Sequence, residues 1–139
     1  MTIRAIGFDY LGVVARSGAG SFIVDEQLLH LADQLRAAGY RVGLLSNLGA
    51  DWAPELSQQG LHQHFEAVLL SGSIGYAKPD PRAFEVLATR LGVALSELIF
   101  IDDSSASLEG TPALGMTPLL YHNYTELIAS LRQQGVHWD

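Results

Sequence analysis

The stretch AIGFDYLGVV at residues 5–14 decides the fold. The apolar run from Ile3 to Phe8 has the length and composition of a buried strand, and Asp9 ends it. Gly12 then permits a tight turn. In open α/β sheets, ligands bind at the carboxyl ends of the strands. The stretch therefore predicts a strand that delivers Asp9 to a ligand-binding edge.

Four further apolar runs of strand length follow, at Val42 to Leu45, Ala67 to Leu70, Leu98 to Ile101 and Pro118 to Leu120. The segments between them have helical period. The two clearest helices begin at the capping residues Asp25 and Asp80 and end at Gly39 and Gly92. Weaker helices are expected at Asp51 to Gln59, Ala106 to Ala113 and Tyr124 to Gln133. This alternation predicts an α/β fold, with a mainly parallel five-stranded sheet and helices on both faces.

Length and composition limit the classes of function. The 139 residues suit a single domain spanning 1–139. The net charge of −7 and the lack of a basic run predict no nucleic-acid partner. There is no cysteine, which excludes disulfides, thiolate catalysis and cysteine zinc sites. No apolar stretch is long enough for a membrane span or has the form of a leader, so we expect a cytoplasmic protein.

Two segments do not fit the strand and helix alternation. Residues 12–22 are rich in Gly, Ser and Ala, which predicts a hairpin-like flap or mobile loop beside the Asp9 edge. The tail from Gly135 to Asp139 is expected to be loosely held. Among the histidines, we expect His30 to be structural, and His62 and His64 to face solvent rather than bind a metal.

Polar residues follow the apolar strands at four points. They are Asp9, Ser46 with Asn47, Lys78 and the pair Asp102 and Asp103. Any one of them alone is typical of a turn, a helix cap or a solvated loop. In this order, within FD, LLSN, AKPDP and FIDDS, they resemble the motifs of the haloacid dehalogenase (HAD) superfamily, which is dominated by phosphatases. The resemblance covers residues 3–122 and implies a Rossmann-like three-layer sandwich.

The resemblance also implies a role for each residue. Asp9 is the expected nucleophile, Ser46, Asn47 and Lys78 the expected binders of the transferring group, and Asp9, Asp102, Asp103 and the Leu11 carbonyl the expected ligands of Mg²⁺. The chemistry independently requires such residues, because an anionic nucleophile must approach a phosphoryl group whose charge is neutralised. Mg²⁺ prefers one or two carboxylates together with phosphate and water. The expected partner is a phosphorylated small molecule or macromolecule.

Leu11 is the main departure from the superfamily pattern. In its phosphatases, an aspartate two residues after the nucleophile protonates the leaving group and then activates water. Losing such general acid–base assistance costs about 10²- to 10⁴-fold. We therefore expect a weak or narrow Mg²⁺-dependent phosphatase that favours acyl or aryl phosphates.

Two other functions remain open on the sequence. One is a non-catalytic HAD-fold protein that binds phosphate, metal or a protein partner, which Leu11 favours. The other is a dehalogenase, against which the pair Asp102 and Asp103 argues. The intervals between the motifs are too short for a large cap, so water exclusion would come from a large substrate or from an oligomeric neighbour.

Overall fold

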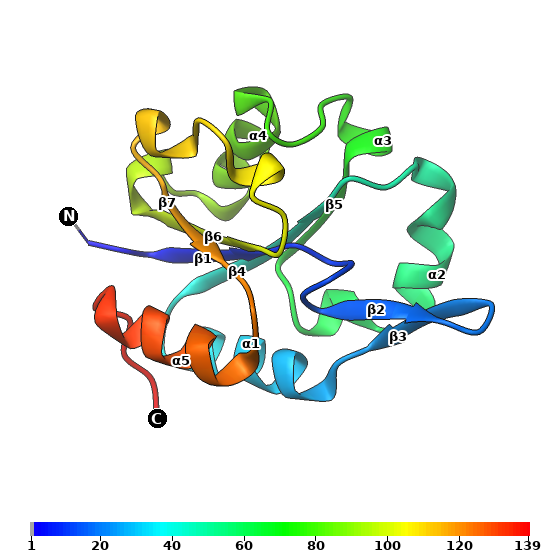
Figure 1. The fold of residues 1–139 in the computed structure, drawn as a ribbon, viewed down its shortest axis with the longest axis horizontal. Helices are drawn as coiled ribbons and strands as arrows, with labels where there is room; N and C mark the ends of the chain where they lie inside the picture. The colour runs from blue at the N-terminus through cyan, green and yellow to red at the C-terminus, as the bar shows by residue number, and fades with distance from the viewer. Residues whose placement is uncertain (1) are drawn as a thin grey trace.

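A computed structural model describes residues 2–139. Its main sheet has five parallel strands, as predicted, and their order is β5-β4-β1-β6-β7. Their bounds are β1 Ala5–Phe8, β4 Arg41–Ser46, β5 Ala67–Leu70, β6 Leu98–Asp102 and β7 Thr117–Leu120. The chain thus builds the sheet outward from β1 in one direction and then, after β5, in the other (Figure 1). This reversal is the Rossmann-like arrangement.

Helices cover both faces of the sheet and make three layers. Helices α1 (Glu26–Ala37) and α5 (Tyr124–Gln133) lie on one face, and α4 (Pro81–Leu91) lies on the other (Figure 1). The predicted caps are confirmed, since the side chain of Asp25 accepts from the backbone N–H of Gln27 at 2.9 Å and Asp80 accepts from that of Arg82 at 2.9 Å. Gly92 ends α4 in the left-handed conformation, which glycine adopts without strain.

Two apolar clusters, one on each face, hold the sheet to its helices. β1, β4 and β6 are almost wholly buried, as expected for central parallel strands. On the α4 face, the Phe84 and Phe100 rings meet edge to face at 5.3 Å. Gly7 makes this contact possible, because a Cβ there would lie 2.6 Å from the Phe100 ring. The glycine inside β1 is therefore explained by close packing beneath the Asp9 edge.

The expected flap is a two-stranded antiparallel hairpin. It consists of β2 (Ala15–Gly18) and β3 (Ser21–Val24), and it projects beside helix α2 (Ala53–Gln58) (Figure 1). The Phe22 ring packs on Trp52 with centroids 4.6 Å apart. Tyr10 donates to the side chain of Gln59, which in turn donates to the carbonyl of Phe22 at 3.3 Å. These contacts anchor the hairpin, so it is not the mobile loop that its composition allowed.

Three local predictions are wrong. The helix expected at 106–113 is two short 3₁₀ turns, η4 (Ala106–Leu108) and η5 (Thr111–Leu114), because Gly110 between them is left-handed. The tail is not loose, since Trp138 is buried, stacks on the Arg132 guanidinium at 3.9 Å and accepts hydrogen bonds from it. His30 is exposed on α1 rather than structural.

Short elements complete the chain. They are η1 (Ala50–Trp52), which precedes α2 inside the helix expected at 51–59, η2 (Leu61–Gln63), α3 (Ser71–Ile74) and η3 (Leu95–Glu97). Across residues 2–139 no insertion forms a large cap, as predicted. None of the helices in this range combines the length and hydropathy that crossing a bilayer requires.

Candidate active site

The predicted site residues converge where the strand order reverses. Asp9 follows the central strand β1, while Ser46 ends β4 on one side of it and Asp102 ends β6 on the other. All three side chains belong to residues that are more than nine-tenths buried. This edge is where open α/β sheets bind ligands. The three strands therefore present one hydroxyl and two carboxylates to a common point.

Lys78 links two of these strand ends. Its side chain is 1% exposed, and its Nζ donates to Asp9 Oδ1 at 2.8 Å and to Asp102 Oδ2 at 2.7 Å. The ammonium also lies 4.9 Å from the centroid of the Phe100 ring. A buried ammonium is stable only when paired and hydrogen-bonded, and the two carboxylates supply both conditions. Lys78 is thus fixed at the centre of the site.

Asn47 positions the loop that carries Lys78. Its Nδ2 donates to the Lys78 carbonyl at 3.0 Å, and its Oδ1 accepts from the Lys78 backbone N–H at 2.9 Å. The sequence left two roles open for this residue, reaching the substrate or bracing the loop. The paired hydrogen bonds favour bracing, so we interpret Asn47 as a positioning residue rather than a direct substrate binder.

Three carboxylates form a compact cluster. Oxygens of Asp9, Asp102 and Asp103 lie within 4.8 Å of one another. Asp103 is the exposed member, and it sits directly against Gly12, where a Cβ would lie 2.2 Å from its Oδ2. A residue with a side chain at position 12 would therefore displace Asp103. The sequence indicated only that Gly12 permits a turn, since its contact with a distant residue has no local signal.

The electrostatics of this cluster match a divalent cation. Three ionised carboxylates with one ammonium carry a net charge of −2. Burial raises the pKa of Asp9 to about 7, an effect that Lys78 reduces and the charge of Asp102 reinforces. Oxygen ligands of this kind are those that Mg²⁺ prefers. The residues present therefore fit a magnesium ion.

The carboxylate that Leu11 lacks is not replaced by another acidic residue in the cluster. In the part of the chain described, this cluster contains only Asp9, Asp102 and Asp103. The Leu11 side chain is half-buried and packs against the apolar core beneath α1 and α5. Tyr10 belongs to the same core. Within residues 2–139 the cluster thus has no fourth acidic residue.

Ser46 remains a predicted binder of phosphate. The Ser46 residue is 2% exposed, and its hydroxyl is not among the buried polar atoms of residues 2–139 that lack a hydrogen bond. A phosphoryl oxygen at the strand ends would accept a hydrogen bond from this hydroxyl.

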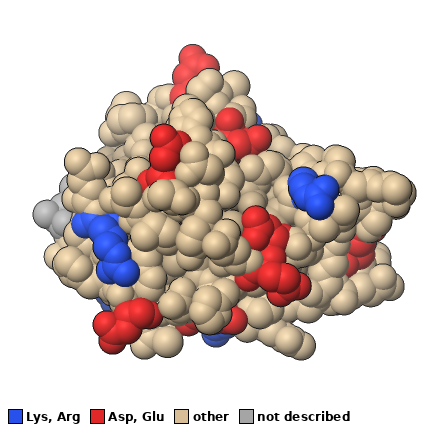
Figure 2. All heavy atoms as spheres, turned by 60° about the horizontal axis from the view of Figure 1, so that its bottom comes forward, with Lys and Arg blue, Asp and Glu red and all other residues tan. Residues whose placement is uncertain are grey.

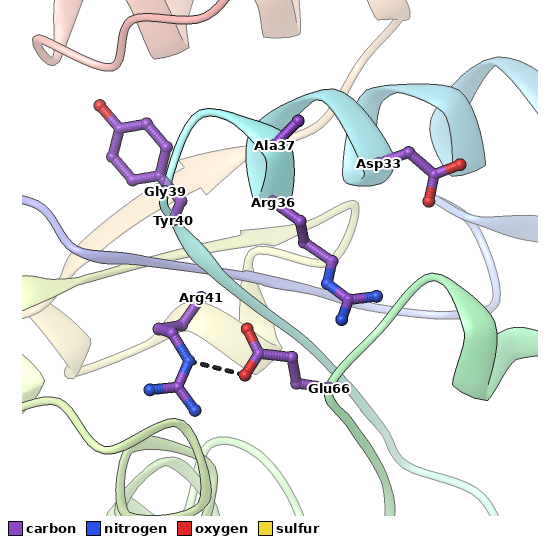
Figure 3. A pocket seen from close by; sticks show the side chains of 7 residues that line it. All are labelled: Asp33, Arg36, Ala37, Gly39, Tyr40, Arg41 and Glu66. Atoms are coloured by element: carbon purple, nitrogen blue, oxygen red, sulfur yellow. Dashed lines mark hydrogen bonds and ion pairs between the residues drawn. The ribbon is translucent and has the colours of Figure 1, made fainter.

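A large hollow of about 510 Å³ lies away from these residues (Figure 3). It is at the opposite edge of the sheet, where Arg41 begins β4. Two ion pairs lie there, with Arg41 Nε 2.6 Å from Glu66 Oε2 and Asp33 Oδ1 2.8 Å from His64 Nδ1. Arg36, which also lines the hollow, donates to the Gln63 carbonyl at 3.1 Å. The excess of negative charge lies instead at the carboxyl edge of the sheet.

Comparison with known proteins agrees with this geometry. The family model for haloacid dehalogenase-like hydrolases matches residues 5–115, most of the chain and all the site residues. The chain belongs to this family. Among HAD relatives, a phosphoglycolate phosphatase from Salmonella typhi is 30% identical over 99% of this chain and 54% of its own length. A phosphatase from Mycobacterium tuberculosis is 38% identical over 63% of this chain and 42% of its own.

The chain spans about half the length of these curated relatives. Several solved structures match it over nearly their whole length. An uncharacterised protein from Corynebacterium glutamicum has a TM-score of 0.74 and 27% identity, with 99% of this chain and 98% of that one covered. A HAD family enzyme from Bacteroides thetaiotaomicron, in complex with magnesium and inorganic phosphate, has a TM-score of 0.77 and 17% identity over 90% and 98%. These matches confirm the predicted HAD fold without a large cap.

Proposed function

We propose that the protein is a Mg²⁺-dependent phosphatase that acts through an aspartyl-phosphate and accepts only phosphates with good leaving groups. The observation that carries this proposal is the buried Lys78, held between Asp9 and Asp102 with Asp103 beside them. Phosphatases among the relatives support the reaction class. The Bacteroides structure supports the cofactor, because its complex holds magnesium and phosphate on the same fold.

Asp9 attacks phosphorus in this proposal. A new bond forms between an Asp9 carboxylate oxygen and phosphorus, and the bond from phosphorus to the leaving oxygen breaks. Lys78 and the Ser46 hydroxyl hold the phosphoryl oxygens and offset their charge. Water then hydrolyses the aspartyl-phosphate, which returns Asp9 and releases phosphate.

A magnesium ion would be held by Asp9, Asp102, Asp103 and the Leu11 carbonyl. When bound, it lowers the charge repulsion between the nucleophile and the phosphate. It also offsets the net charge of −2 on the cluster. Asp9 then remains a carboxylate, although in the metal-free site its burial, only partly offset by Lys78, raises its pKa to about 7.

Leu11 determines the substrate range in this account. The Leu11 side chain cannot protonate a departing alkoxide, and assistance of that kind is typically worth about 10²- to 10⁴-fold. Acyl and aryl phosphates release weakly basic anions and lose least. A large phosphorylated substrate or a neighbouring copy of the chain would exclude water in place of a cap.

The test is a phosphate-release assay on acetyl phosphate, 4-nitrophenyl phosphate and glycerol phosphate, with Mg²⁺ or with a chelator. We expect activity on the first two only, dependent on Mg²⁺ and abolished in Asp9→Asn. A parent activity that survives Asp9→Asn would contradict the assignment of the nucleophile.

A second candidate function is ligand binding without turnover, and Leu11 is the observation that favours it. In that case the parent binds phosphate and Mg²⁺ but hydrolyses none of the three substrates. Leu11→Asp would then create hydrolysis in an otherwise intact site.

A further inference from the structure

A second hollow, of about 360 Å³, opens between the hairpin and the end of β7. Its wall includes Gly12, Arg16 and Ile23 from the first part of the chain and Tyr121 from the segment after β7. Arg16 and Ile23 are directly opposite each other on β2 and β3, so their side chains share one face of the hairpin. Ile23 is 43% exposed, which is unusual for a large apolar side chain in this protein.

This hollow adjoins the carboxylate cluster. Gly12 forms part of its wall and also contacts Asp103, where a Cβ on the glycine would lie 2.2 Å from Oδ2. Tyr121 is tied to the same site from the other side, since its backbone N–H donates to the Asp102 carbonyl at 2.8 Å. The hollow and the carboxylate cluster are therefore neighbours that share Gly12.

Arg16 has no ionic partner there. Within residues 2–139, Arg16 and Arg90 are the two cationic side chains that make neither a hydrogen bond nor a salt bridge. Asp25 also lines the hollow, but its carboxylate accepts from the Gln27 backbone N–H at the start of α1. The Arg16 guanidinium is thus an unpaired charged donor beside the apolar residues that line the hollow.

Basic charge is sparse around this region. The face that carries α1 and α5 shows dispersed acidic side chains and isolated basic ones (Figure 2). The chain as a whole has 8 basic against 15 acidic residues. An unpaired arginine next to a phosphate-type site is therefore a specific feature rather than part of a general basic surface.

We propose that this hollow is the leaving-group subsite and that Arg16 selects substrates whose leaving group carries a carboxylate on an apolar body. The inference rests on the proposed phosphatase function and names its substrate class, a carboxylated aryl or acyl phosphate. Arg16 supplies a planar pair of donors that suits a carboxylate. Asp25 disfavours a more highly charged group such as a second phosphate, while Ile23 and Tyr121 contact the apolar body.

Two matched compounds test this proposal: 4-carboxyphenyl phosphate and its methyl ester, 4-(methoxycarbonyl)phenyl phosphate. The ester group withdraws electrons more strongly, so leaving-group chemistry alone favours the ester. We expect the parent to prefer the carboxylate by about 10-fold in kcat/KM. In Arg16→Gln this ratio falls to about 1 or below, whereas in the control Arg90→Gln, an exposed arginine on α4, it is retained.

A binding measurement tests the proposed subsite independently of the proposed phosphatase activity. Dissociation constants for both compounds are measured by calorimetry with Asp9→Asn in Mg²⁺, alone and combined with Arg16→Gln. A preference for the carboxylate that depends on Arg16, with no turnover by the parent, supports the subsite and overturns the phosphatase. Equal binding of the two compounds, no binding of either, or a preference that survives Arg16→Gln overturns the subsite.

Discussion

The two edges of the central sheet differ in how their charged side chains are balanced. At the amino edge, Arg41 pairs with Glu66 and His64 with Asp33, and these groups are partly exposed. At the carboxyl edge, one buried ammonium faces three carboxylates, and a carboxyl group there has its pKa raised to about 7. The larger hollow is at the balanced edge. We therefore base the proposed function on this charge imbalance rather than on the size of a cavity.

The largest expected effect comes from removing one cation at each edge. Lys78→Met leaves Asp9 and Asp102 buried without their partner, and we expect a loss of about 3–5 kcal/mol in the free energy of unfolding. Arg41→Met breaks a pair whose arginine side chain is 47% exposed, with an expected loss below about 1 kcal/mol. Urea unfolding in the presence of a chelator measures both.

A second variant keeps this prediction testable if Lys78→Met does not fold. The double variant Lys78→Met with Asp102→Asn removes one of the two carboxylates left without a partner. It should therefore recover part of the lost free energy of unfolding. Equal losses for Lys78→Met and Arg41→Met would mean that the two edges do not differ electrostatically.

The next effect is the pH dependence of the metal-free protein. Because folding raises the pKa of Asp9 from its ordinary value of 3.8 to about 7, the folded state binds this proton more tightly than the unfolded chain does. The associated stability is fully present below about pH 4 and is lost as the pH rises to about 7. Thermal unfolding in chelator should show this fall, amounting to a few kcal/mol, and Asp9→Asn should remove most of it. Added Mg²⁺ should restore stability at pH 7 to 8 in the parent; no restoration would argue against the metal site.

A smaller effect is expected from a single methyl group at Gly12. Gly12→Ala places a Cβ against Asp103 and should weaken Mg²⁺ binding by about 10-fold, as changes in residues that orient a metal ligand do. Gly20→Ala is the matched control, because Gly20 also has a positive φ but has no atom within 4 Å of the place that a Cβ would take. Titration of Mg²⁺ by calorimetry compares them. If both variants weaken binding equally, backbone strain rather than contact with Asp103 is responsible.

Much of the fold and of the site could be predicted from the sequence. Apolar runs that end in polar residues predicted where Asp9, Ser46 and Asp102 lie, because parallel strands bring their carboxyl ends to one edge. Caps and terminal glycines predicted the start and end of α4. Local signals of this kind depend only on residues that are neighbours in the sequence, and the structure confirms the elements that they predicted.

The rest depended on contacts between distant residues. The tail is held because Arg132 stacks on Trp138, which no periodicity indicates. The bracing of Lys78 by Asn47 joins loops 31 residues apart. The contact between Gly12 and Asp103 could not be predicted either, because it forms only when β1 and β6 pair in the folded sheet.

The central claim is that Asp9 has every group it needs except a proton donor at position 11. The most direct measurement is kcat/KM for a series of aryl and alkyl phosphates, plotted against the pKa of the leaving group, in the parent and in Leu11→Asp. The account predicts a steep fall with rising leaving-group pKa in the parent, and in Leu11→Asp a shallow one with a gain of about 10²- to 10⁴-fold for alkyl phosphates. A shallow dependence in the parent, unchanged by Leu11→Asp, would contradict it.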